Sequence, residues 1–427
     1  MRLSIKSSLR LFFSKHSIFL QNLSYMTVLQ VFMLIAPLIT YPYLVKTIGK
    51  ELYGNFLTAQ MLASYASLLI DFGSNSVCAK HVSQNRKNIG ILSEIISSVY
   101  IVRSLLWFIC FLLYLGVVYL VPAYRAFFII YLLSYGLTFQ ELLFPQYYFQ
   151  GIEEMKYITY INISVKLVFI LLVFIVVKGP GDFVYLPILY SLGYFLGGVA
   201  ANIIVFKYKK VPFRFPKKER IMYYVKDCLP IFGTDLICSI KDKFNYLLVG
   251  SYSGMGNVVV YDLGTKLNGF LGKPTEIIKT VLFPKMANEK NLRLLKRSIV
   301  FTIGLTVSLV LIANLFLPQI VHFFIHEEIN LLPIRLFTLA PIILSLSVML
   351  ATNLIVAFGY NRFLLYSILI TTFAYLVSLA VMVVTGRMSS LYSFVAIALV
   401  SYCVELVYRI LASFRIIKLE RNAHEKV

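Results

Sequence analysis

The chain has 427 residues, of which 59% are hydrophobic and 14% are charged, and it carries a formal net charge of +21 at pH 7. Soluble domains contain about a quarter charged residues, so this composition excludes an ordinary soluble fold and indicates an all-α membrane protein. In such a protein the excess of lysine and arginine is expected on cytoplasmic loops beside anionic lipids, so the charge does not indicate nucleic-acid binding.

Twelve apolar runs follow one another along the chain, and each reaches the ~20 residues that a helix needs to cross a bilayer. The first run is expected to be a retained span, because residues 1–20 carry four basic residues and no cleavage site of small residues. We therefore predict about twelve transmembrane helices. The runs lie at 23–45, 53–77, 95–119, 126–149, 157–177, 183–206, 228–251, 258–283, 298–321, 333–357, 363–384 and 391–411.

The lysines and arginines outside these runs are unevenly distributed. With the N-terminus inside, the cytoplasmic segments hold 26 of them and the opposite loops hold 5. Because cytoplasmic loops are enriched in positive charge, this bias predicts a multi-pass protein of the bacterial inner membrane with both termini in the cytoplasm.

The strongest break in composition is KYKKVPFRFPKKERIMYYVK at 207–226, which holds eight basic residues and two prolines. It separates the sixth apolar run from the seventh, and transporters are often built from two repeated halves. We therefore predict an N-terminal six-helix bundle over 1–206, a basic cytoplasmic linker over 207–226, and a C-terminal six-helix bundle with a cytoplasmic tail over 227–427.

Charged residues inside the predicted spans are candidates for function, because a charge at mid-bilayer costs free energy. The first half has only four: Asp71, Arg103, Glu141 and Lys166. The two acids lie toward cytoplasmic ends, where they could cap a helix or meet a loop lysine. The two cations could snorkel to the interface or line a cavity.

The eighth run is much richer in charge. Asp262, Lys266, Gly269, Lys273 and Glu276 follow one another at steps of 4, 3, 4 and 3 residues, which places them on one face of a helix. The glycine, together with a proline one position after Lys273, is expected to interrupt the helix, as in midplane binding sites of transporters.

The seventh run carries a second polar stripe at the same period. Two adjacent helices with polar stripes predict a water-filled cavity, because their charges cannot face lipid. The alternative is that Asp262 with Lys266, and Lys273 with Glu276, are internal ion pairs that offset each other's desolvation. The stripe consists of Asp235, Ser239, Asp242 and Tyr246, flanked by Lys241 and Lys243.

The turn after the first run is expected to be tight. Pro37 and Pro42 are predicted to break the first helix, and Gly49 and Gly54 to form an outward turn.

No enzymatic or cofactor motif is found. There is no P-loop, and the outward loops are too short to form a catalytic domain, so we predict a transporter without catalytic residues or cofactor. The five cysteines are scattered, which predicts neither disulfides nor a metal site. His322 and His326 have metal-ligand spacing beside two glutamates, but two histidines alone are more simply explained as a solvated pair.

Four segments resemble the bacterial polysaccharide flippases (O-antigen or Wzx-like transporters), a branch of the multidrug/oligosaccharidyl-lipid/polysaccharide exporter superfamily. The first departs from the family pattern at Lys46, where an arginine is expected, and at Ile48, where a leucine is expected. Their order and spacing extend the resemblance over nearly the whole chain. The segments are APLITYPYLVKTIGKELYGNF at 36–56, LLIDFGSN at 68–75, YYFQGIEEMKYIT at 147–159 and FNYLLVGSYSGMGNVVVYDLGTKL at 244–267.

The resemblance implies two six-helix bundles around a central cavity lined mainly by the first, second, seventh and eighth spans. The implied substrate is an oligosaccharide repeat unit on undecaprenyl pyrophosphate, moved from the cytoplasmic to the periplasmic leaflet by alternating access. Implied partners are membrane lipids, H⁺ or Na⁺, and the polysaccharide polymerase and chain-length machinery. An ion-coupled multidrug exporter of the same superfamily and a membrane polysaccharide polymerase are the alternatives.

If the protein is such a flippase, the charged residues inside the predicted spans are candidates for two roles, substrate binding and ion coupling. Lysine supplies a point charge for a pyrophosphate, and a carboxylate can exchange the coupling ion. The candidates for substrate binding are Lys241, Lys243, Lys266, Lys273, Lys279 and Arg103. The candidates for ion coupling are Asp235, Asp242, Asp262, Glu276 and Asp71.

Overall fold

The computed structural model describes residues 17–424, without the side chains of residues 17–20, 240–242 and 421–424. All regular structure in this part of the chain is helical, which confirms the all-α class. Within residues 17–424, ten helices are long and apolar enough to cross a membrane. The other two predicted spans coincide with α12 (Lys218–Leu248) and α13 (Met255–Glu289), which are long but rich in charge. The count of twelve spans therefore stays a prediction.

The chain divides into two compact units, Met1–Leu236 and Ile237–Val427. The boundary lies inside α12, so the basic segment 207–226 and the first part of α12 belong to the first unit.

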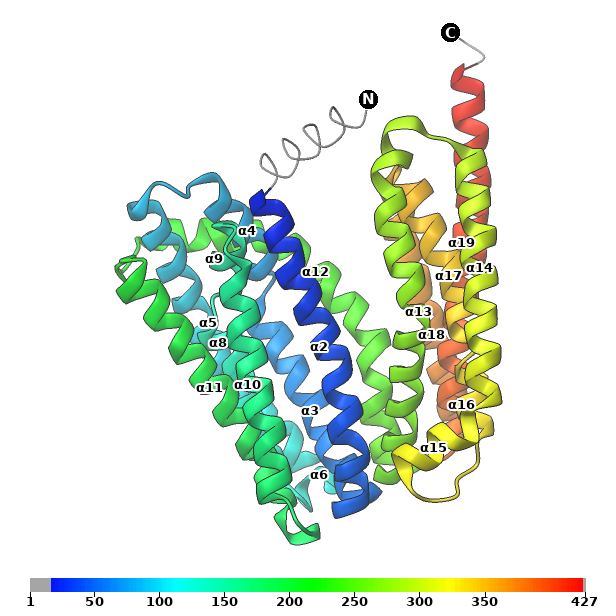
Figure 1. Ribbon diagram of the computed structural model, residues 1–427, viewed down its shortest axis with the longest axis horizontal. Helices are drawn as coiled ribbons and strands as arrows, with labels where there is room; N and C mark the ends of the chain where they lie inside the picture. Colours follow the sequence, from blue (N-terminus) through cyan, green and yellow to red (C-terminus); the bar gives the residue numbers. More distant parts are fainter. Residues whose placement is uncertain (1–16, 425–427) are drawn as a thin grey trace, which may run out of the picture. The chain divides into compact units, whose positions relative to one another are not determined.

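The first unit is built around long helices that pack side by side. In Figure 1 α2 runs beside α3 and α10, and these pairs are in contact. A hydrophobic core of this unit contains Ile95, Tyr147 and Phe149, all buried. Its α-helices are α2 (Ser17–Ile48), α3 (Lys50–Asp71), α4 (Ser74–Gln84), α5 (Ile89–Leu120), α6 (Pro122–Arg125), α7 (Phe128–Ser134), α8 (Phe139–Leu143), α9 (Gln146–Gly151), α10 (Met155–Val176) and α11 (Tyr185–Ile203). Three short helices complete it: η1 (Tyr135–Thr138), η2 (Pro180–Val184) and η3 (Ile204–Tyr208).

The second unit holds the rest of α12 and the helices that follow it. Its core contains Met286, Met349 and Ile416, so that α13, α17 and α19 pack on one another. Beyond α12 and α13, its helices are α14 (Leu292–Leu315), α15 (Leu317–Ile325), α16 (Leu332–Phe337), α17 (Ala340–Leu350), α18 (Asn361–Val384) and α19 (Leu391–His424), with η4 (Val249–Ser253) and η5 (Ala351–Val356).

The two units repeat two local structures. Gly49 before α3 has φ 84° and ψ 156°, and Gly254 before α13 has φ 100° and ψ 148°, a left-handed turn that glycine adopts without strain. Asn88 caps α5 by accepting a hydrogen bond from the third residue on, and Asn291 caps α14 in the same way. Each pair stands at the corresponding helix of its unit, which is the pattern of an internal repeat.

Three predictions about helix breaks are wrong. Pro37 and Pro42 lie inside the continuous helix α2, and α13 runs unbroken through Gly269 and Pro274. Gly54 is buried inside α3, so Gly49 alone makes the turn. Proline is tolerated in membrane helices because neighbouring helices and small adjustments satisfy the carbonyls that it frees.

Candidate functional site

The second unit contains a cavity of about 480 Å³. One wall is the middle of α13, and the other walls come from α16, α17 and α19. Polar and aromatic side chains share the lining, so the cavity can accommodate a ligand that is partly polar. The polar lining residues are Thr265, Asn268, Lys273, Thr275, Glu276, Ser345, Tyr261 and Tyr402.

Three residues of the stripe predicted on α13 line this cavity: Gly269, Lys273 and Glu276. The ion pair expected between Lys273 and Glu276 is replaced by one between Glu276 and Lys279, with 2.8 Å from Nζ to Oε2. Lys273 is exposed and has no carboxylate partner among the residues that the structure describes. It therefore presents an unneutralised cation at the cavity wall.

Asn268 adds an unused hydrogen-bond acceptor. Its side-chain oxygen is buried and accepts no hydrogen bond from the described part of the chain. Since buried polar atoms normally have a partner, a ligand donor or a water in the cavity would satisfy it.

The other end of the stripe is occupied by an internal ion pair. Asp262 is buried and pairs with Lys266, four residues on, as the alternative interpretation of the sequence expected. Its other oxygen accepts a hydrogen bond from the hydroxyl of Tyr246 at 3.1 Å. Tyr246 belongs to the predicted stripe on α12, so the two stripes do meet at this point.

The remaining predicted residues of α12 are spread over both units. Asp235 lies in the first unit and is partly buried. Lys243 lies in the second unit and is partly buried. The side chains of Lys241 and Asp242 lie outside the described residues.

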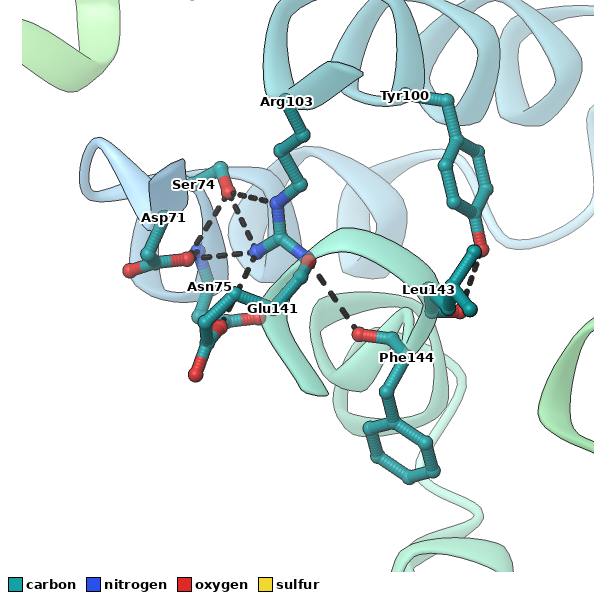
Figure 2. A network of polar contacts seen from close by, with 8 residues as sticks. All are labelled: Asp71, Ser74, Asn75, Tyr100, Arg103, Glu141, Leu143 and Phe144. Atoms are coloured by element: carbon teal, nitrogen blue, oxygen red, sulfur yellow. Dashed lines mark hydrogen bonds and ion pairs between the residues drawn. The ribbon is translucent and has the colours of Figure 1, made fainter. Parts of the chain in front are cut away.

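Arg103 is the centre of a polar network in the first unit. Figure 2 shows its guanidinium directed at oxygen atoms of α3, α4 and α8. Nη2 lies 2.6 Å from Oδ1 of Asp71 and donates to Oγ of Ser74 at 2.8 Å, and Nε donates to the same hydroxyl at 3.1 Å. Nη1 donates to the backbone oxygens of Glu141 at 2.5 Å and Phe144 at 3.4 Å.

The groups of this network enclose the side chain of Arg103. Its side chain is 1% exposed, and the ring of Tyr147 lies 5.4 Å below its carbon Cζ. The side chain of Glu141 lies 3.9 Å from Nη2 and accepts a hydrogen bond from Asn75 at 3.1 Å. Arg103 therefore holds three helices together in this conformation, instead of snorkelling or facing a cavity.

Lys166, the other cation of the first half, is surrounded by aromatic rings. Its Nζ donates to the hydroxyl of Tyr190 at 3.0 Å and lies 4.5 Å from the centre of that ring and 5.2 Å from that of Phe169. Among the described residues it has no carboxylate partner.

Sequence reasoning missed one buried ion pair. Arg409 and Glu405 on α19 lie 2.6 Å apart and are both 8% exposed, and Arg409 also donates to Ser347 at 2.9 Å. Their spacing of four residues inside an apolar run was the available signal. The rings of His322 and His326 lie 6.4 Å apart, and the described residues contain no cluster of three metal-binding side chains.

Comparisons with known proteins agree with this fold. Residues 19–290 match the family described as polysaccharide biosynthesis protein. A protein of Shigella dysenteriae named "Putative O-antigen transporter" is 29% identical over 237 residues, which cover 54% of this chain and 58% of the relative. A protein of Escherichia coli K12 with the same name is 23% identical over 286 residues, covering 67% and 69%. The chain thus spans less than two thirds of the Shigella relative.

The fold is also found in solved structures, including the two that follow. The lipid II flippase MurJ in an inward closed conformation superposes with a TM-score of 0.65 at 13% identity, covering 92% of this chain and 87% of that chain. An inward-facing multidrug resistance transporter of the MATE family, in the MOP superfamily, gives 0.62 at 14% identity, covering 90% and 99%. At such low identity the likeness establishes the fold alone.

The helical fold and the ten described helices that are apolar enough to cross a membrane define a multi-pass membrane protein, whose fold is shared by these two solved structures. More particularly, the chain belongs to the polysaccharide biosynthesis protein family, since that family matches 19–290 of its 427 residues. This confirms the predicted family.

Proposed function

We propose that the protein is a flippase that moves an oligosaccharide repeat unit on undecaprenyl pyrophosphate from the cytoplasmic to the periplasmic leaflet by alternating access. The observation that carries the proposal is the cavity of about 480 Å³ with Lys273 on its wall. A cation without a carboxylate partner attracts a pyrophosphate, while hydroxyl and amide groups can bind sugar hydroxyls. The two relatives named as O-antigen transporters support the substrate class.

Aromatic residues in the same cavity support a sugar-bearing ligand. Tyr261, Phe337 and Tyr402 line it together with the polar groups. Aromatic faces offer apolar contact area, and the two hydroxyls can donate or accept hydrogen bonds. A polyprenyl tail can remain in the bilayer while the polar head occupies such a cavity.

The ion pairs reduce the number of carboxylates that are candidates for ion coupling. Asp71 pairs with Arg103, and Asp262 and Glu276 pair with lysines of α13. Among the candidates whose side chains are described, Asp235 alone has no cationic partner. We therefore propose Asp235 as the residue that exchanges H⁺ or Na⁺, with both termini in the cytoplasm as the charge bias predicts.

The multidrug exporter is the second candidate, and the cavity disfavours it. A cavity for cationic drugs should carry net negative charge. Among the described residues, Glu276 is the one carboxylate that lines the cavity and is paired with Lys279, whereas Lys273 has no carboxylate partner.

A deletion strain tests the proposed function. The strain should accumulate lipid-linked repeat units that face the cytoplasm and should lose the surface glycan, and the wild-type gene should restore both. Lys273→Gln should restore the glycan poorly at normal protein level. Lys296→Gln, at an exposed position of α14, is the matched control and should restore it fully. Unchanged repeat units and glycan after deletion would exclude the flippase.

The coupling proposal has its own test. Asp235→Asn keeps size and hydrogen bonding but removes the titrating group, so substrate-dependent proton or sodium flux in reconstituted vesicles should fall. Normal flux and normal export in this variant would place coupling at another carboxylate, Asp242 first.

A further inference from the structure

The segment between α11 and α12 is fixed to the first unit and is not a loose tether. Lys209 pairs with Glu154 at 2.6 Å, and Arg220 pairs with Glu94 at 3.2 Å. Val211 is buried. These contacts hold both ends of the segment and its centre on the end of the helical unit.

Backbone groups between these points are held as well. The amide of Arg214 donates to the hydroxyl of Ser97 at 3.0 Å, and the hydroxyl of Ser93 donates to the carbonyl of Pro212. The backbone of residues 207–218 is therefore held in place, and we call these residues the platform. The side chains that project from the platform have fixed positions on the first unit.

Three aromatic side chains project from the platform. Phe215 is 87% exposed, Tyr208 70% and Phe213 43%. The rings of Phe213 and Phe215 lie 5.3 Å apart, edge to face. An exposed phenylalanine pair held in place at the end of membrane-spanning helices is a costly arrangement in water and a favourable one at the bilayer interface.

Five cations lie in the same segment of the chain as these rings and take no part in the two ion pairs. They are exposed, and among the described residues none has a carboxylate partner. Over 207–226 the sequence offers a single acid, Glu219. The five are Lys207, Lys210, Arg214, Lys217 and Lys218.

We infer that this platform, residues 207–218, binds the anionic phospholipids of the membrane surface, with Phe213 and Phe215 inserted among the headgroups. The partner is identified by charge and by position. Clustered lysines and arginines attract anionic headgroups, each by about fivefold, and aromatic rings at the ends of spans lie at headgroup level. Neither property depends on the transported substrate.

The test uses the intact protein in vesicles. Phe215→Trp adds a second tryptophan to Trp107, the only one in the chain, and the difference in fluorescence quenching between variant and parent reports on position 215. Two vesicles are compared: brominated phosphatidylglycerol in a phosphatidylcholine background, and brominated phosphatidylcholine in a phosphatidylglycerol background. We expect strong quenching in the first and weak quenching in the second.

A charge reversal separates lipid selectivity from simple proximity to the bilayer. Lys210→Glu, Lys217→Glu and Lys218→Glu together should reduce the preference for phosphatidylglycerol by at least about a hundredfold, because the loss of each lysine removes a factor of about five. The matched control reverses three exposed cations of α14, at positions 293, 296 and 297, and should leave quenching at 215 unchanged.

Three results would overturn the inference. Equal quenching by both brominated lipids would mean that the rings insert without headgroup selectivity. No quenching by either lipid would mean that the platform stands away from the bilayer, as a protein-binding surface would. Equal effects of the two triple variants would assign the preference to overall charge. Elution as a single species in size-exclusion chromatography verifies that each variant is folded.

Discussion

Removing Arg103 should destabilise the protein strongly, because the change leaves Asp71 without its cation. Breaking a buried ion pair costs about 3–5 kcal/mol. The side chain of Asp71 is 19% exposed and keeps hydrogen bonds from Ser74 and from the amide of Asn75, both at 3.1 Å. These contacts offset part of the loss, so we expect about 3 kcal/mol for Arg103→Ala, at the lower end of that range.

The assay is reversible unfolding in mixed micelles of a mild detergent and dodecyl sulfate, followed by the fluorescence of Trp107. Arg103→Ala and Asp71→Ala, alone and combined, form a double-mutant cycle, and the pair should be non-additive by at least about 1 kcal/mol. Arg335→Ala, at an exposed position of α16, is the control and should change stability by less than about 0.5 kcal/mol.

Additive losses would refute this reasoning, and so would a loss below about 1 kcal/mol for Arg103→Ala. Either outcome would mean that the guanidinium is not committed to Asp71, and it would restore Arg103 as a candidate for binding the substrate.

Gly151→Ala should cost about 1–3 kcal/mol, because its Cβ would lie 2.5 Å from a side chain of α4, whereas Gly116→Ala meets nothing within 4 Å and should be tolerated in the same unfolding assay. Asp227→Ala removes the carboxylate that lies 2.7 Å from a buried histidine of α4 and should cost about 1 kcal/mol. The hydrogen bond from Arg86 lowers the pKa of Glu153. The small stabilisation from this pair should therefore be complete above the ordinary pKa of glutamate and lost as the pH falls through the lowered value, so stability curves of Glu153→Gln and wild type should converge in acid; curves that stay parallel would exclude the pair.

The apolar runs predicted most of the fold because a helix in lipid needs little more than length and hydrophobicity. Ten of the runs coincide with helices that meet both conditions. The predicted breaks at Pro37 and Pro274 failed because sequence alone does not reveal which neighbours absorb a freed carbonyl. The repeat of the Gly49 turn at Gly254 was readable only from backbone angles, since the residues around the two glycines differ.

For the site, too, the sequence predicted which residues of α13 share a face but not which side chains pair with one another. The periodicity of the stripe correctly grouped Gly269, Lys273 and Glu276 on one face. Glu276, however, has a lysine three residues away on each side, and only side-chain geometry shows that Lys279 is the one it pairs with. The Arg103 network could not be predicted from the sequence for a different reason: the partners of Arg103 lie 29 to 41 residues away in sequence.

The charge carried by α12 and α13 has a consequence for how the protein is made. Judged on the described residues, neither helix is among the ten that are long and apolar enough to cross a membrane. During synthesis, a helix with a buried Asp262 depends on Lys266 and on the hydroxyl of Tyr246 in the preceding helix to offset the charge. We therefore expect α12 and α13 to leave the translocation channel together. A pause or a truncation between them would then leave α12 outside the bilayer.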